Sequence, residues 1–69
     1  MKWFTLKWQD VSEGCTVEHF LRKETAERRE NEVRQISNFE QSFGITEVVV
    51  RNNKELVDWL NHFYTTENG

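Results

Sequence analysis

A lone cysteine, Cys15, sets the first limit on this fold, because an intrachain disulfide needs two. A disulfide-stapled secreted scaffold is therefore excluded. A chain of 69 residues buries only about 60% of the surface that its unfolded form exposes, which leaves a small margin of stability. Its core must come from large apolar side chains, and three tryptophans, five phenylalanines and one tyrosine supply them. We expect one domain over residues 1–69.

The charge of the chain argues against one broad class of partner. Charged residues make up 30% of the sequence with a net charge of -3, whereas charge-driven binding to nucleic acid or anionic membranes needs a basic excess. No apolar run approaches the roughly 18–20 residues that a membrane span requires. Lys7 and Asp10 interrupt the first segment, where a signal peptide would be apolar. With a reduced cysteine as the default state, we expect a cytoplasmic protein.

Two segments have the pattern of β-strands. Residues 2–9 alternate, with Phe4, Leu6 and Trp8 on one face, as in a half-buried strand. Residues 45–50 form a β-branched run that favours a strand. A sheet of only two strands is marginal by itself and leaves both edges exposed. We therefore predict that the edge formed by the branched run pairs with a second copy of the chain.

The segment between the two strands predicts helices, with one alternative. Residues 10–14 are typical of a turn, and Thr16 can cap a helix that begins there. Apolar residues then follow at helical spacing: Val17, Phe20 and Leu21. A turn and a strand over residues 15–21, which would make an N-terminal hairpin, remain the alternative.

A second apolar stripe consists of Ala26, Val33, Ile36, Phe39 and Phe43, and Gly44 follows as a helix stop. The first and second stripes are offset by about a third of a turn, too much for one straight helix to keep both against one core. We therefore expect two helices, with a break near residues 23–25.

The end of the chain predicts an amphipathic helix. Asn52 and Glu55 have the spacing of a capping arrangement. A wide apolar face follows: Leu56, Val57, Trp59, Leu60, Phe63 and Tyr64. We expect Leu60 in the core and fraying of residues 65–69. The predicted fold is α+β, a small single domain in the order strand-helix-helix-strand-helix with a two-stranded sheet, extended if the chain dimerises.

The sequence contains no constellation that predicts catalysis or metal binding. Cys15 and His19 would share one face of a helix, but a zinc site needs three or four protein ligands. His62, the only other histidine, lies on the polar side of the last helix. Gly14 and Gly44 stand alone and form no phosphate-binding loop. We expect no catalytic residue, no cofactor and no metal.

Residues 22–34 hold five bases and four acids. On a helix the bases spread around the axis instead of forming a stripe, which favours a solvated surface with i,i+4 ion pairs over a nucleic-acid interface. Trp3 points to the opposite face of its strand from Trp8, and Trp59 flanks the apolar stripe of the last helix. Exposed tryptophans are enriched at binding hot spots. The candidate partner-binding residues are Trp3, Trp59, Arg22, Arg28, Arg29 and Arg34.

Residues 13–23 resemble the first helix of the alpha-L RNA-binding motif, and residues 33–36 and 48–53 are similar to its second helix and following strand. The resemblance implies a helix-helix-strand order, with RNA contacts from Arg22, Lys23, Arg28, Arg29 and Arg34. The sequence departs from the motif in three places. Arg29-Glu30 replaces a Ser-Arg pair, the helix-to-strand connection is longer, and Asn53 replaces a glycine.

These observations predict a small non-enzymatic regulatory or inhibitory protein that acts by binding a larger protein partner. The alternative is an RNA-binding module that uses an arginine-bearing helix pair.

Overall fold

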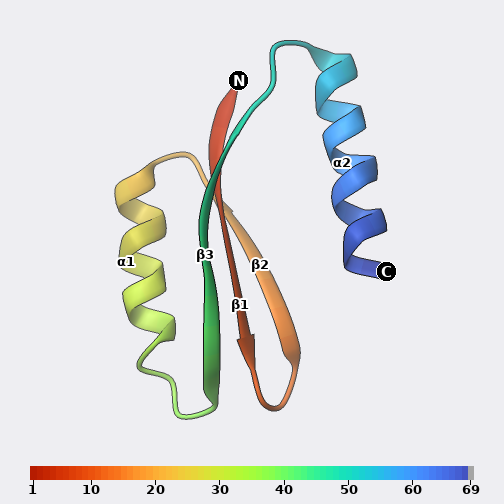
Figure 1. Cartoon of the computed structure of the whole chain (residues 1–69). Coiled ribbons are helices and arrows are strands. Elements are labelled where there is room, and N and C mark those ends of the chain that lie inside the picture. The colour runs from red at the N-terminus through yellow and green to blue at the C-terminus, as the bar shows by residue number, and fades with distance from the viewer. Residues whose placement is uncertain (69) are drawn as a thin grey trace.

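The structure, a computed structural model, describes the backbone of residues 1–68 and the side chains of residues 1–62. Its elements follow the order β1 (Lys2–Asp10), β2 (Gly14–Phe20), α1 (Lys23–Val33), β3 (Phe39–Val49) and α2 (Asn53–Asn68). The three strands form one antiparallel sheet in the order β2-β1-β3. The two helices lie on opposite faces of this sheet (Figure 1). The class is therefore α+β, as expected.

The predicted order, strand-helix-helix-strand-helix with a two-stranded sheet, is wrong. The chain forms three strands in the order strand-strand-helix-strand-helix, and the hairpin alternative for residues 15–21 is confirmed. Val17 and Phe20 are three positions apart, so their side chains point to opposite faces of β2. Both side chains are partly buried. Because each face of the sheet carries a helix, apolar residues occur at both parities, and their spacing imitates a helical stripe.

The turn between β1 and β2 is confirmed. The Asp10 carboxylate accepts hydrogen bonds from the backbone N–H groups of Glu13 and Ser12. These hydrogen bonds lower the pKa of Asp10 below its ordinary value, and the bond from Glu13 has the largest effect. Gly14 closes the turn with a φ of 85°, a conformation that residues with a Cβ rarely adopt. The hairpin is therefore specified by its own sequence.

The second predicted helix is much shorter than expected. It forms α1, which ends at Val33 and not at Phe43, and β3 begins at Phe39. Phe43 is an extra residue in β3, because Lys7 pairs with Gly44 while Trp8, the next residue of β1, pairs with Ser42. Gly44 has a φ of 92° at this β-bulge. Its predicted role as a helix stop is therefore also wrong, since the left-handed conformation serves the bulge.

The face of the sheet beneath α1 holds a fully buried core. Leu6 and Val33 are each 0% exposed and pack with Trp8. Phe20, Phe39 and Ile45 surround this cluster. The predicted inward parity of β1 is confirmed here, since Leu6 and Trp8 are buried. This half of the molecule is closed by side chains from all three strands and one helix.

The opposite face carries a second cluster, formed by Trp3, Val48 and Val50. Leu56 and Trp59 of α2 pack against it. The predicted cap of α2 is confirmed, because the Asn52 side chain accepts a hydrogen bond from the Glu55 N–H at 2.9 Å.

The C-terminal half of α2 meets only part of the expectation. Leu60 is 37% exposed and does not reach the core position that its spacing predicts. The side chains of Phe63 and Tyr64 lie outside the described residues. Fraying of residues 65–69 stays a prediction, since α2 extends to Asn68 and residue 69 is outside the described range.

None of the helices in the described part of the chain has the length and apolar character needed to cross a bilayer.

Candidate functional site

An apolar groove lies between α2 and the end of the sheet where β1 begins and β2 ends. Its volume is about 450 Å³. Its walls come from β1, the end of β2, the turn after β2, and α2, and the main lining residues are Trp3, His19, Leu21, Leu56, Trp59 and Leu60. We call this site the Trp3–Trp59 groove. It brings together two residues that the sequence singled out from opposite ends of the chain.

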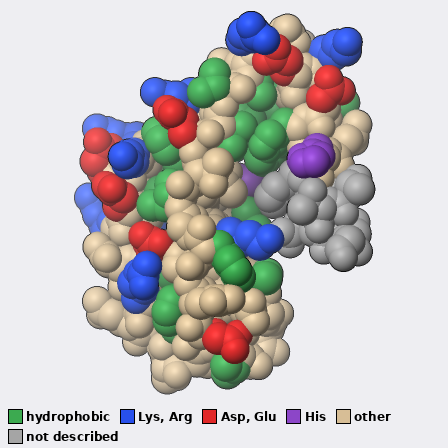
Figure 2. Space-filling view, viewed as in Figure 1, with side chains coloured by type: hydrophobic (Ala, Val, Ile, Leu, Met, Phe, Trp, Pro, Cys, Tyr) green, Lys and Arg blue, Asp and Glu red, His purple; other side chains and the backbone are tan. Residues whose placement is uncertain are grey.

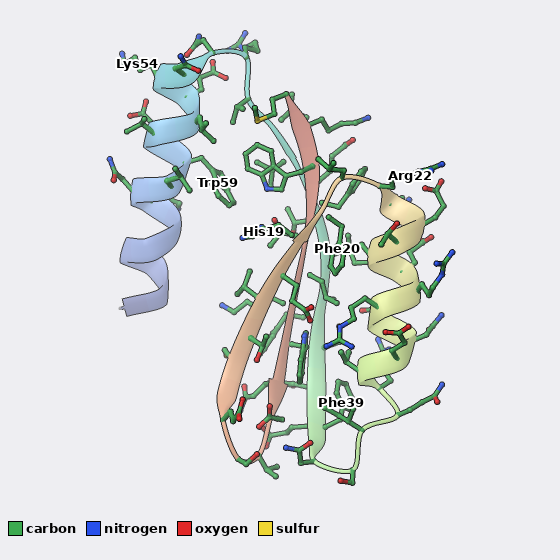
Figure 3. The ribbon with its side chains drawn as sticks, turned by 180° about the vertical axis from the view of Figure 1, so that it is seen from behind. His19, Phe20, Arg22, Phe39, Lys54 and Trp59 are labelled. Atoms are coloured by element: carbon green, nitrogen blue, oxygen red, sulfur yellow. The ribbon has the colours of Figure 1, made fainter. Side chains whose placement is uncertain are left out.

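Trp3 and Trp59 are the most buried tryptophan side chains that line the groove, and we call this pair its base. Their ring centroids are 5.0 Å apart with an interplanar angle of 88°, the edge-to-face geometry that aromatic pairs prefer. Trp3 is 9% exposed, so its main contribution is to packing. Trp59 is half-buried and reaches from α2 toward the sheet (Figure 3). That Trp3 and Trp59 contact a partner stays a prediction, and Trp59 is the more exposed of the two.

His19 forms the part of the groove wall that comes from β2. Its Nδ1 lies 3.1 Å from the Thr5 hydroxyl, and Thr5 is buried. The imidazole also meets the Trp59 ring at 5.7 Å, again edge to face. His19 points toward α2, whereas its neighbour Phe20 points toward α1 (Figure 3). His19 thus acts here as a spacer between the sheet and α2.

The rim of the groove is apolar and open to solvent. Leu21 is 84% exposed and Met1 is 75% exposed, although both are large hydrophobic residues. Exposed apolar side chains gathered around a hollow mark an interaction surface more often than isolated ones do. Leu21 was not among the site residues predicted from the sequence. No signal in the sequence marked Leu21 as exposed, because its helical spacing with Val17 and Phe20 predicted a buried stripe.

The four candidate arginines lie away from this groove. Arg22 lies at the start of α1, on the other side of the sheet from Trp59 (Figure 3). Arg28 and Arg29 are on α1, and Arg34 is its C-cap. The structure therefore separates the arginines from the tryptophan pair by the thickness of the sheet.

Acidic side chains engage three of these arginines. The Arg29 Nε lies 3.1 Å from Glu18 Oε2, and this interaction raises the pKa of Arg29 above its ordinary value. Arg34 is 3.4 Å from Glu30, while Arg22 is 3.9 Å from Glu24 at an exposed position. Basic and acidic side chains alternate over the α1 side of the surface (Figure 2). This arrangement agrees with the ion-paired helix that the sequence favoured.

Cys15 and His19 both belong to β2. Four residues of strand separate their Cα atoms by about 13 Å, beyond the reach of a nucleophile and its base. Cys15 is exposed, and its Sγ is 3.8 Å from the Gln9 side-chain oxygen. Within the described residues, no group of three or more His, Cys, Asp or Glu side chains could hold a metal ion.

No protein-family model, curated protein or solved structure matches this chain significantly. The resemblance to the alpha-L RNA-binding motif also fails on the fold, because residues 14–20 form β2 where the motif has its first helix. The helix pair on which the implied RNA contacts depend is therefore not formed.

Proposed function

We propose that this protein is a small non-enzymatic regulatory or inhibitory protein that binds a larger protein partner through the Trp3–Trp59 groove. The partner inserts an apolar segment, whose branched or aromatic side chains contact Trp59 and Leu21. The observation that supports this most is the apolar hollow of about 450 Å³ with an exposed apolar rim. The reduced, exposed Cys15 is compatible with action in the cytoplasm.

The rim favours a protein partner over a small ligand. A hollow of this volume is also large enough for a small molecule. Such a ligand would leave much of Leu21 and Met1 in water, because these lining residues are 84% and 75% exposed. A protein surface covers the base and the rim together, which removes more apolar area from water. Trp59, with its large side chain at the base, has the character of a binding hot spot.

The RNA-binding alternative has less support. Its arginines belong to a single helix and its flanks, and Arg29 and Arg34 are already engaged by acids of the same chain. Binding to phosphates would have to break these pairs, at a cost that an unpaired basic stripe avoids.

The test uses Leu21→Glu, with Val11→Glu as its matched control. Both positions are strongly exposed, at 84% and 70%, but Val11 lies in the hairpin turn at the other end of the sheet. Immobilised wild-type protein and both variants are incubated with nuclease-treated lysate of the source cells, and bound proteins are quantified by mass spectrometry. We expect a protein that wild type and Val11→Glu retain but Leu21→Glu loses.

Equal recovery by all three proteins would contradict a role for the groove. A second arm titrates the purified protein with total RNA at increasing salt. Binding that weakens steeply with salt and is insensitive to Leu21→Glu would replace the proposal with the RNA-binding alternative.

A further inference from the structure

The edge of the sheet along β3 presents backbone groups that pair with no other group in the described part of the chain. The Val50 N–H donates to the Met1 carbonyl at 2.9 Å, and the Met1 ammonium group donates to the Val50 carbonyl at 2.8 Å. This pair therefore exchanges both hydrogen bonds. In an antiparallel ladder such pairs recur every second residue, so Val48, Thr46 and Gly44 also direct their backbone groups toward β1.

The β3 residues between these pairs direct their backbone groups away from β1. Ile45, Glu47 and Val49 direct their N–H and C=O groups away from β1, toward the free edge. In the described part of the chain, these six groups have no hydrogen-bond partner. In Figure 1, β3 faces the viewer between the helices, and neither helix passes in front of it. The outward row is thus accessible to another strand.

We infer that β3 pairs antiparallel with β3 of a second copy of this chain, about a two-fold axis that passes through Glu47. This axis is the one that maps the three outward residues onto themselves. It sets Glu47 opposite Glu47 of the second copy, and Ile45 opposite Val49 at each end. All three outward pairs then exchange both hydrogen bonds, which gives six across the interface.

The side chains at the interface fit this pairing. Ile45 is partly buried at the edge of the core beneath α1, and Val49 is 61% exposed on the same face. The two-fold places Val49 of one copy beside Ile45 of the other, so that each covers apolar surface of its partner. The two Glu47 carboxylates meet at the axis, and each has Lys2 of its own chain at 3.3 Å, which reduces their repulsion.

The other edge of the sheet is less suited to the same role. On β2 the outward residues are Cys15, Val17 and His19, because their neighbours pair with β1. A two-fold through Val17 would place cysteine opposite histidine, with no branched pair at either end. His19 is already held by Thr5 and Trp59. The structure therefore favours β3 over β2.

The resulting dimer is a continuous antiparallel sheet of two copies of β2-β1-β3. An axis perpendicular to the sheet keeps equivalent faces on the same side, so both Trp3–Trp59 grooves would open on one face. The pairing uses a surface separate from the groove, and either proposal can fail without the other.

The test removes an outward N–H by Val49→Pro in the full-length chain. Proline is tolerated on an edge strand where its missing N–H would face solvent, so the monomer should keep its fold by circular dichroism. Val17→Pro is the matched control, because it removes an outward N–H from the β2 edge. Sedimentation equilibrium is run for all proteins from micromolar to millimolar concentration.

We expect wild type and Val17→Pro to dimerise with the same affinity. Val49→Pro should weaken dimerisation roughly tenfold or more, because two hydrogen bonds are lost, one from each copy. If Val49→Pro fails to fold, Val49→Lys at the same exposed position should weaken association by placing a charge against Ile45. A monomeric wild type at millimolar concentration, a loss confined to Val17→Pro, or equal losses in both proline variants would overturn the proposal.

Discussion

Each face of the sheet carries one helix, yet α1 and α2 are attached in different ways. Under α1, Leu6 and Val33 retain no exposed surface. Under α2, the contact runs mainly through the Trp3–Trp59 pair, beside a groove of about 450 Å³. In the described part of the chain, α1 has Cα atoms within 8 Å of each of the three strands, whereas α2 has none within that distance of another element.

Polar contacts add to the difference. The Glu18 carboxylate receives hydrogen bonds from Arg29 of α1 and from Nε1 of Trp8 at 3.0 Å, so it joins the helix to two strands. The polar contacts that define the start of α2 are local, because Glu55 binds Arg51 only four residues away. A small protein can therefore place most of its stability on one face and leave apolar surface on the other for a partner.

The largest effect is expected from Leu6→Ala. This side chain is 0% exposed at the centre of the cluster beneath α1. Its truncation should lower the free energy of unfolding by about 2–5 kcal/mol, because it leaves a cavity in a domain of small stability. Urea denaturation measures the change. A loss below about 1 kcal/mol would show that the face beneath α1 is not the main core.

Trp59→Ala tests the opposite face. The side chain is half-buried, so its removal should lower the free energy of unfolding by about 1–2 kcal/mol, less than Leu6→Ala despite the larger residue. The same urea titration provides the comparison. If Trp59→Ala costs as much as Leu6→Ala, the two faces contribute equally and the proposed division is wrong.

A smaller loss is expected from Arg29→Met, with Arg28→Met as its control. Methionine keeps an apolar stem in both cases, but Arg29 binds Glu18 whereas Arg28 is exposed on the same helix. Arg29→Met should cost about 1 kcal/mol, since the pair is partly exposed, and Arg28→Met close to none. Equal thermal stability of the two variants would contradict a structural role for the Glu18 pair.

The smallest effect concerns pH and the cap of α2. The backbone N–H of Arg51, followed by its guanidinium, lowers the pKa of Glu55 below its ordinary value of 4.5. A lowered pKa means that Glu55 stabilises the fold above its ordinary pKa and loses this contribution as the pH falls through the lowered one. Denaturation of wild type and Glu55→Gln from pH 7 to pH 3 should show a difference that shrinks on acidification. A difference that grows as the pH falls would reverse the sign of this argument.

Several elements could be predicted because their local sequence specifies them. The alternation of Phe4, Leu6 and Trp8 located β1, and the spacing of Asn52 and Glu55 located the start of α2. Tertiary context decided the rest. Residues 14–20 fit a helix by spacing, but they form a strand because both faces of the sheet receive apolar residues.

The start of β3 was obscured by a bulge. Two register shifts set Phe39, Ser42 and Ile45 three residues apart on one face of the sheet, and this spacing removes the period of two that would mark a strand. The sequence predicted two residues of the groove but not their contact. Trp3 and Trp59 were selected, but their contact depends on how α2 returns over the sheet, and the pairing of Arg29 with Glu18 depends on β2 lying under α1.

Native-state amide hydrogen exchange tests most directly whether α2 can open separately from the rest of the fold. Amides of β1 and α1, such as those of Leu6 and Val33, should exchange only through global unfolding, with the free energy that urea denaturation gives. Amides of α2 from Leu56 to Leu60 should exchange at a clearly lower free energy, through opening of α2 alone. Identical free energies for α1 and α2 would show one cooperative unit, and would contradict the view that the α2 face is held loosely enough to receive a partner.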